Sequence, residues 1–247
     1  MLMKNAYINP ISAIKYLDFL NSPNGEIQKR VLAHSILSLL PKDTNIKILD
    51  AGCGNGWLSE ILKQNYSHIN ACDASIFLIN FAKSHFSKIN FQVTDLEHSL
   101  PYPNEEFNVV ILNMVLPDVE KLPEVFKNIS GVLKPNGNLI TTIPNPKYTY
   151  PAAEWKRSIM NILLGQKPQL QIKSTPPSGQ IQREYAKNSL IDSYFYNLSD
   201  YILNAKKFGF ELIQTQEIKP EAPSTKFDLN YQLSLFPLLL TLNFKKT

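Results

Sequence analysis

The amino-acid sequence predicts an α/β fold built on a seven-stranded, mostly parallel β-sheet with helices on both of its faces. Short apolar runs alternate with segments of helical periodicity from residue 46 onward, which is the pattern of a parallel sheet covered by helices. A glycine-rich turn joins the first of these runs to the helix that follows it. A loop rather than a helix joins the last two apolar runs, which predicts one antiparallel strand in the sheet.

The seven predicted strands are Ile46–Asp50, Ile69–Cys72, Phe91–Thr94, Phe107–Leu112, Asn138–Ile143, Phe210–Ile218 and Leu238–Phe244. Helices are expected to begin near Trp57, Ser75 and Glu120. Two further helices occupy residues 10–40 and stop at Pro41, which lacks a backbone N–H. A last helix is expected to start with Ser199 as its N-cap and to end at Gly209.

The composition is that of a folded globular protein. The length of 247 residues suits one α/β domain with an added cap. Hydrophobic residues make up 44% and charged residues 19%, so a packed core is expected. The net charge of +4 is spread along the chain, and the absence of a Lys/Arg run predicts no nucleic-acid partner.

Two cysteines, Cys53 and Cys72, are too few for a disulfide framework, and no Cys/His spacing resembles a zinc site. The most apolar stretch, Leu233–Leu242, is ten residues long, well short of the roughly 20 that span a bilayer. The first ten residues lack an apolar core of signal-peptide length. We therefore expect a cytoplasmic protein without a metal site or a membrane span.

We expect four parts in the chain: an N-terminal helical cap (1–40), the ligand-binding core (41–143), an inserted cap (144–198) and the C-terminal part of the core (199–247). The insertion interrupts the alternation of strands and helices and contains six prolines and seven aromatic residues. A linker exposed to solvent would not need so many aromatic side chains. The insertion is therefore expected to form, together with the N-terminal cap, a mobile lid over the ligand-binding edge of the sheet.

Gly52, Gly54 and Gly56 form a turn after a strand and before a helix N-terminus, where backbone can approach a ligand closely. Their G-x-G-x-G spacing differs from the G-x-G-x-x-G of dinucleotide-binding turns. Asp50 ends the strand beside the turn, and a carboxylate there would repel a pyrophosphate. S-adenosylmethionine has no phosphate but carries an α-ammonium, a sulfonium and one carboxylate, so it matches this turn better than NAD does.

Two further acidic residues follow predicted strands. Asp73 follows the second strand, where an acid conventionally accepts both ribose hydroxyls of a bound nucleoside. Asp95 follows the third strand, where it can accept a hydrogen bond from an adenine amino group while Leu96 or Ile76 packs on the ring. Ligands bind at the carboxyl edge of such a sheet, so these acids are expected to share one site.

These features resemble class I S-adenosylmethionine-dependent methyltransferases. Their first motif is similar to Leu49-Asp50-Ala51-Gly52-Cys53-Gly54-Asn55-Gly56, and their later motifs resemble, in order, Asp73, Thr94–Glu97, Phe107–Leu112 and Leu133–Leu139. The nearest type is the small-molecule group that includes quinone- and biotin-pathway methyltransferases. The resemblance implies a Rossmann-like sheet, S-adenosylmethionine as cofactor, S-adenosylhomocysteine as product and a small-molecule methyl acceptor. It implies a cofactor site formed by Asp50, Gly52, Cys53, Gly54, Gly56, Asp73, Ala74, Asp95, Leu96 and Asn113.

The chain departs from these relatives at two positions. They often carry His-Pro after the fifth strand, where this chain has Asn145-Pro146, and a histidine before the late helix, where it has Asn197. Any role of those histidines therefore does not transfer to this chain.

Methyl transfer is an in-line displacement at an activated sulfonium carbon, and it depends mostly on holding the acceptor close and aligned. The sequence identifies no dedicated catalytic residue. The candidates are His34, as a general base if its helix lines the pocket, and Tyr148 and Tyr196, which could orient an acceptor. His34 lies among apolar residues of a predicted helix, so the simpler expectation is a histidine packed in the core.

We expect a metal-independent methyltransferase that acts on an O or N atom of a small molecule. One alternative is an RNA or protein methyltransferase, for which the pI of about 8.9 is the supporting observation. A non-catalytic cofactor-binding protein is another alternative. An NAD-dependent oxidoreductase is disfavoured by Asp50 and by the glycine spacing.

Overall fold

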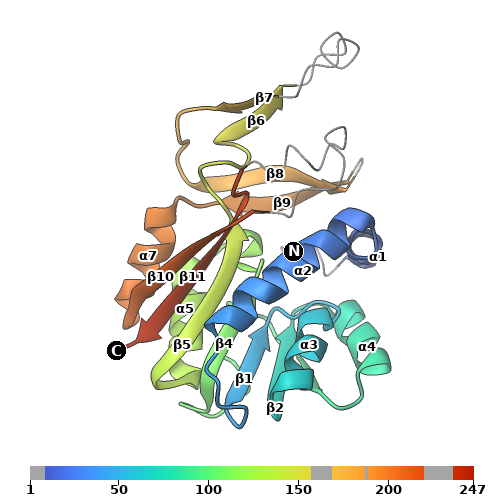
Figure 1. The fold of residues 1–247 in the computed structure, drawn as a ribbon, viewed down its shortest axis with the longest axis vertical. Coiled ribbons are helices and arrows are strands. Elements are labelled where there is room, and N and C mark those ends of the chain that lie inside the picture. Colours follow the sequence, from blue (N-terminus) through green and yellow to red (C-terminus); the bar gives the residue numbers. More distant parts are fainter. Residues whose placement is uncertain (1–8, 157–168, 187–188, 220–235) are drawn as a thin grey trace.

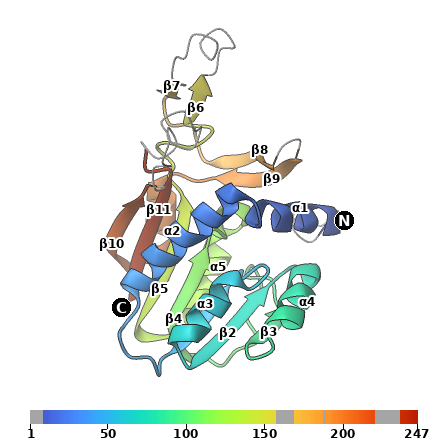
Figure 2. The ribbon, with the colours of Figure 1, turned by 45° about the vertical axis from the view of Figure 1, so that its right-hand side comes forward.

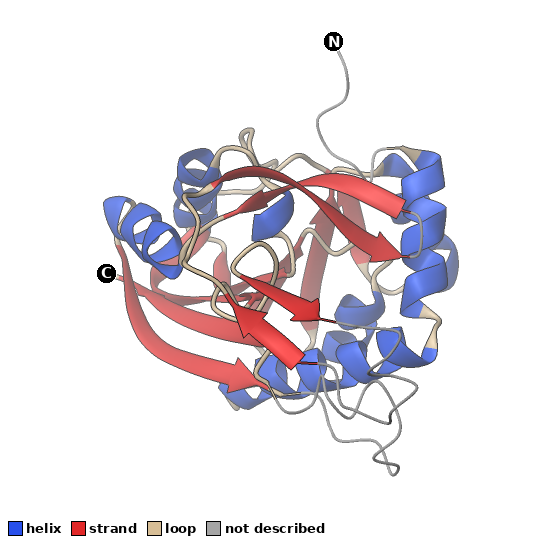
Figure 3. Cartoon of the chain, turned by 90° about the horizontal axis from the view of Figure 1, so that it is seen from above, coloured by secondary structure: helices blue, strands red, loops and turns tan. Residues whose placement is uncertain are grey.

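The computed structural model describes residues 9–156, 169–186, 189–219 and 236–247, and its main feature is a seven-stranded sheet with helices on both faces (Figures 1 and 3). The strand order is β10-β11-β5-β4-β1-β2-β3. The strands are β1 (Lys47–Ala51), β2 (His68–Asp73), β3 (Asn90–Val93), β4 (Phe107–Asn113), β5 (Leu133–Pro144), β10 (Phe210–Ile218) and β11 (Leu239–Lys246). All seven predicted strands are therefore present.

The sheet is parallel except at β11. β1 pairs in parallel with β2 and β4, β2 with β3, and β4 with β5. β11 runs antiparallel to both of its neighbours, β5 and β10, which confirms the single antiparallel strand. This topology brings the carboxyl ends of six strands to one edge, the upper edge of the sheet in Figure 1.

The helices are α1 (Pro10–Leu20), α2 (Pro23–Leu39), α3 (Trp57–Asn65), α4 (Ile76–His85), α5 (Leu122–Val132) and α7 (Leu198–Lys207), with a short 3₁₀ helix η2 (Leu116–Asp118). α2, α3 and α4 cover one face of the sheet, and α5 and α7 cover the other (Figure 2). Each buries an apolar stripe at helical spacing. In α5 this stripe is Leu122, Val125, Phe126, Ile129 and Val132.

The N-cap of α7 is Asn197, not Ser199 as the sequence predicted. The N–H of Asn197 donates to the carboxylate of Asp200 at 2.9 Å, which satisfies a main-chain donor at the helix start. Ser199 lies inside the first turn. The predicted end of the helix is confirmed, because Gly209 follows it with a φ of 78°.

Where the structure describes the insertion, it forms two hairpins rather than an irregular segment. β6 (Ala153–Lys156) pairs with β7 (Gln169–Ile172), and β8 (Gly179–Ala186) pairs with β9 (Ser189–Phe195). Residues 1–8, 157–168 and 187–188 of the predicted lid lie outside the described residues. The β8–β9 hairpin lies above the carboxyl edge of the sheet, and it contacts η2 and α1 (Figures 1 and 2).

Within the described part of the chain, no helix has both the length and the apolar character needed to cross a membrane.

We expect the packing around β11 to be essential for stability. The Leu242 side chain is fully buried in this strand, so Leu242→Ala should lower the free energy of unfolding by about 2–5 kcal/mol. Leu203→Ala is the matched control, because Leu203 is 57% exposed on α7 and its loss should change stability by no more than about 0.5 kcal/mol. Urea unfolding followed by circular dichroism measures both changes. Equal effects of the two substitutions would contradict the position of β11 in the core.

Candidate active site

The glycine-rich turn between β1 and α3 is fixed by bonds to β2. The N–H groups of Gly52 and Cys53 donate to the carbonyl of Cys72, at 2.7 and 2.9 Å. The N–H of Gly54 donates to the Asp73 carboxylate at 2.9 Å. The turn therefore lies over the carboxyl ends of β1 and β2, as the sequence predicted.

Glycine is required at two positions of this turn. Gly52 has a φ of 77°, and a Cβ added there would lie 2.3 Å from a methyl carbon of Val115. Gly56 has a φ of 83°, and an added Cβ would lie 2.9 Å from the ring of Phe91. Residues with side chains rarely adopt positive φ. Gly52 thus lets the segment after β4 approach the turn, and Gly56 lets α3 begin close to β3.

The carboxylate of Asp50 is fully buried at the end of β1. Its Oδ2 accepts a 2.6 Å hydrogen bond from the Ser59 hydroxyl, whereas Oδ1 has no hydrogen-bond partner among the described residues. Burial raises the pKa of Asp50 from 3.8 to about 7; the Ser59 bond opposes this rise and the charge of Asp73 adds to it. A buried carboxylate oxygen without a partner is unfavourable, so this atom favours a ligand that brings a cation or an N–H group.

Both carboxylate oxygens of Asp73 hold main-chain N–H groups. Oδ2 accepts the bond from Gly54, and Oδ1 accepts the N–H of Ser75 at 2.8 Å. Burial nevertheless raises the pKa of Asp73, and the charge of Asp118 raises it further. An ionised carboxylate offers about four acceptor positions, so Asp73 retains capacity for two hydroxyl groups.

Three carboxylates thus lie close together at the carboxyl edge, where the charge of Asp73 acts on Asp50 and that of Asp118 acts on Asp73. Mutual repulsion of this kind is relieved by a positively charged ligand. The residues present therefore fit S-adenosylmethionine, which carries two positive groups and no phosphate. They do not fit the pyrophosphate of a dinucleotide.

Helix α1 covers this site with Tyr16. A Cβ added to Gly54 would lie 3.3 Å from the Tyr16 ring. Burial and the charge of Asp73 both raise the pKa of Tyr16, so its hydroxyl stays neutral. No local motif marks Tyr16, because packing alone brings it to the turn.

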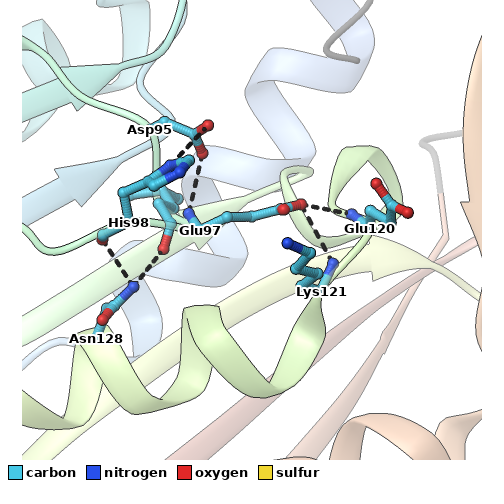
Figure 4. A network of polar contacts seen from close by, with 7 residues as sticks. Asp95, Glu97, His98, Glu120, Lys121 and Asn128 are labelled. Atoms are coloured by element: carbon cyan, nitrogen blue, oxygen red, sulfur yellow. Dashed lines mark hydrogen bonds and ion pairs between the residues drawn. The ribbon is translucent and has the colours of Figure 1, made fainter.

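Asp95 lies in a network of polar contacts after β3 (Figure 4). Its Oδ1 accepts the N–H of Glu97 at 2.9 Å, and its Oδ2 lies 3.2 Å from Nδ1 of His98. The Asp95 side chain is 50% exposed and therefore accessible to a ligand. The side chain of Leu96 is buried in the core, whereas Ile76 is 61% exposed. Of the two residues expected against an adenine ring, Ile76 is the accessible one.

The orientation of Asn113 is set by β5. Oδ1 of Asn113 accepts a 2.7 Å hydrogen bond from the hydroxyl of Thr142, which is its partner in the β4–β5 register. Oγ1 of Thr142 also accepts the N–H of Met114 at 3.0 Å, and Met114 has a φ of 61°. Thr142 therefore shapes the chain where β4 ends, although its own sequence context gave no sign of this.

Cys53 and Ala74 complete the predicted cofactor-binding residues. Cys53 packs among the apolar side chains on the face covered by α3, and burial raises the pKa of its thiol well above the usual range. Ala74 is half-buried between Asp73 and Ser75. Both thus lie at the turn or at the end of β2, with small side chains.

The prediction that His34 packs in the core is wrong, because the residue is exposed. On α2 the buried side chains include Leu32 and Ile36, and His34 lies on the opposite face. His34 lines a cavity of about 410 Å³ between α2 and the last residues of β10. β10 is an edge strand of the sheet, and Val31 and Ile218, which line the same cavity, also pack against Trp57, the first residue of α3.

The hydroxyl of Tyr196 is engaged by the main chain, because it donates to the carbonyls of Val119 and Glu120, each at 2.9 Å. Tyr148 follows β5; its ring packs against Phe236, and the Lys147 ammonium lies 5.1 Å from the ring centre. The Tyr196 hydroxyl thus holds the main chain before α5, whereas the Tyr148 ring lies just beyond the end of β5.

At the two positions where the chain departs from its relatives, the asparagines support the fold. Oδ1 of Asn145 accepts the N–H of Lys147 at 3.1 Å, and its carbonyl accepts the N–H groups of Tyr148 and Thr149. Asn197 is the N-cap of α7.

Comparisons with known proteins identify the chain's relatives as methyltransferases. A family model described as a methyltransferase domain matches residues 25–215. A ubiquinone biosynthesis O-methyltransferase of Coxiella burnetii is 31% identical over 197 residues, which are 76% of this chain and 73% of that protein. A malonyl-[acyl-carrier protein] O-methyltransferase of Buchnera aphidicola is 26% identical over 199 residues, or 81% of this chain and 80% of that protein.

A malonyl-[acyl-carrier protein] O-methyltransferase of Hahella chejuensis is 34% identical over 118 residues, which span 46% of this chain and only 42% of that relative. An S-adenosylmethionine-dependent methyltransferase structure from Mesorhizobium loti has a TM-score of 0.72 at 18% identity and covers 89% of this chain and 99% of its own. This structural likeness supports the fold.

The raised pKa of Asp50 makes cofactor binding depend on pH. A protonated carboxyl does not attract an ammonium group, so affinity for S-adenosylhomocysteine should be full above pH 8 and lost as the pH falls through about 7. If only the ionised form binds, affinity falls about tenfold between pH 8 and pH 6. Calorimetry from pH 5.5 to 8.5 measures this change, and Asp50→Asn should remove it. A flat wild-type profile would contradict the role of Asp50.

We expect Asp73→Ala to weaken S-adenosylhomocysteine binding by about 10- to 150-fold, since hydrogen bonds to a charged group contribute about 1.5–3 kcal/mol. It should also lower the melting temperature of the ligand-free protein, because the N–H groups of Gly54 and Ser75 lose their acceptor. Asp18→Ala, at an exposed aspartate on α1, is the matched control for both measurements. Unchanged affinity in Asp73→Ala would remove Asp73 from the site.

Proposed function

Because the chain belongs to the class I S-adenosylmethionine-dependent methyltransferases, we propose that it transfers the methyl group of that cofactor to an oxygen atom of a small acceptor molecule. The observation that carries the proposal is the buried Asp50 carboxylate beside the glycine-rich turn, whose Oδ1 has no hydrogen-bond partner among the described residues and whose pKa burial and the charge of Asp73 raise. Two relatives that match over 73% and 80% of their own length are both named O-methyltransferases, which supports oxygen as the acceptor atom.

In this proposal each residue of the carboxyl edge has a defined task. Asp50 accepts from the α-ammonium of the cofactor, and Asp73 accepts from the ribose hydroxyls. Asp95 accepts from the adenine amino group, and Ile76 supplies apolar contact to the ring. Asn113 lines the site where β4 ends. When bound, the cofactor supplies an activated methyl group for in-line displacement, and the protein's contribution is to hold the acceptor aligned with it.

The surroundings of the candidate residues support an oxygen acceptor. The candidate base His34 is exposed and lines a cavity beside β10, and the Tyr196 hydroxyl, a candidate for orienting an acceptor, is bonded to two carbonyls. An amine must lose a proton before it can attack, whereas a carboxylate or an acidic phenol is already an anion near neutral pH. An acceptor of this kind needs only positioning.

We also propose that α1 and the β8–β9 hairpin, which contact each other above the carboxyl edge, form the lid over the acceptor. Metal-independent transfer and a cytoplasmic location stay predictions of the sequence. The alternatives are an RNA or protein acceptor and a protein that binds the cofactor without turnover. Turnover assays with labelled S-adenosylmethionine against small carboxylic acids, phenols, amines, RNA and protein distinguish these possibilities.

We expect S-adenosylhomocysteine to raise the melting temperature of the protein and NAD to leave it unchanged. A ligand present at about 100 times its dissociation constant stabilises the fold by about 2.7 kcal/mol. Thermal denaturation with each ligand measures the difference, and Asp50→Ala should reduce the shift caused by S-adenosylhomocysteine. A shift with NAD and none with S-adenosylhomocysteine would refute the proposed function.

A further inference from the structure

The segment Pro117–Lys121, which leads from β4 to α5, is held from two sides. On one side, Oε1 of Glu97 accepts the N–H groups of Glu120 and Lys121, at 2.7 and 3.2 Å (Figure 4). On the other side, the Tyr196 hydroxyl bonds the carbonyls of Val119 and Glu120 at 2.9 Å each. We call Pro117–Lys121 the bridging segment.

The first side belongs to the loop that carries Asp95. Glu97 follows Asp95 by two residues, and the Asp95 carboxylate holds the Glu97 N–H at 2.9 Å. Asn128 of α5 donates to the carbonyls of Leu96 and His98, at 3.0 and 2.7 Å (Figure 4). These bonds link the Asp95 carboxylate to the Glu97 main chain and hold the loop against α5.

The second side belongs to the proposed lid, which consists of α1 and the β8–β9 hairpin. Tyr196 directly follows β9, and Ser193 within β9 donates to the carbonyl of Pro117 at 2.8 Å. The ring of Tyr196 packs edge-on against Tyr201 of α7, with ring centres 5.7 Å apart, so its hydroxyl is directed by packing. β8 and β9 also contact α1, whose Tyr16 covers the glycine-rich turn. The contacts thus run in series from the loop that carries Asp95, through the bridging segment and β9, to the helix that covers the glycine-rich turn.

We infer that Glu97 and Tyr196 are positioning residues that couple the cofactor site to the lid through the bridging segment. Cofactor held by Asp95 fixes the loop, Glu97 then fixes the bridging segment, and Tyr196 and Ser193 fix β9 over the acceptor. The inference rests on the proposed function, because it needs a nucleoside at Asp95. Coupling between two sites changes affinities by about 5- to 150-fold and acts in both directions, so loss of the link should also weaken cofactor binding.

Hydrogen exchange with S-adenosylhomocysteine as the probe tests this coupling. In the wild-type protein, the ligand should slow exchange by at least about fivefold in both the glycine-rich turn and residues 191–195 of β9. In Tyr196→Phe and in Glu97→Ala, it should still protect the turn but no longer protect β9. Glu97→Gln keeps an acceptor oxygen for the two N–H groups and should retain the protection of β9.

Tyr66→Phe is the matched control, because the Tyr66 hydroxyl also donates to a main-chain carbonyl, that of Pro41, at 2.9 Å. It removes the same kind of bond far from the bridging segment, so it should destabilise the protein similarly and leave the protection of β9 intact. If the protection of β9 survives in Tyr196→Phe, the inference is overturned but the proposed function is not. The same holds if the ligand protects the turn but not β9 in the wild type. Failure of the wild type to bind S-adenosylhomocysteine overturns the proposed function as well.

Discussion

The parallel register of β1 with β2 and with β4 pairs Asp50 with Ala71 on one side and with Ile111 on the other. Parallel strands end at the same edge of a sheet, so this register places the acidic ends of β1 and β2 next to each other, beside the segment that follows β4. The glycine-rich turn can then reach β2 with its N–H groups, and Val115 can approach Gly52. A shift of one residue in this pairing would reverse the side chains of the strand and remove Asp50 from the site.

The same arrangement has a cost in the absence of ligand. Because burial raises the pKa of Asp50 above its unfolded value of 3.8 to about 7, the folded protein binds a proton between these pH values that the unfolded chain does not. The contribution of Asp50 to the free energy of unfolding is therefore fully present below about pH 4 and is lost as the pH rises through about 7. Near neutral pH the site is thus at its least stable without a ligand. A cation that pairs with Asp50 offsets this loss. The affinity for such a ligand and the stability of the fold around Asp50 therefore both depend on the same interaction.

Local patterns were sufficient to predict the sheet, the turn and the acids. Seven strands, the turn from Gly52 to Gly56 and the strand-end position of Asp73 depend on short apolar runs and glycine spacing. Features that depend on tertiary packing were not predictable in this way. Tyr16 reaches Gly54 from α1, which is far away in the sequence, and Asn145 and Asn197 serve as structural hydrogen-bonding groups. The exposure of His34 could have been deduced, since helical spacing places it opposite Leu32 and Ile36, but its apolar neighbours in sequence suggested burial.

The single antiparallel strand also affects the order in which the protein can fold during synthesis. β11 lies between β5 and β10, yet Leu239, where β11 begins, lies 95 positions after Pro144, where β5 ends. A ribosome that adds about 5–20 residues per second needs about 5–20 s for that stretch. Throughout this interval β5 has an unpaired edge in what becomes the interior of the sheet, and an unpaired edge is a template for other strands. The nascent chain therefore leaves this edge of β5 unpaired for seconds before β11 covers it, which is long enough for a chaperone or a neighbouring nascent chain to bind there.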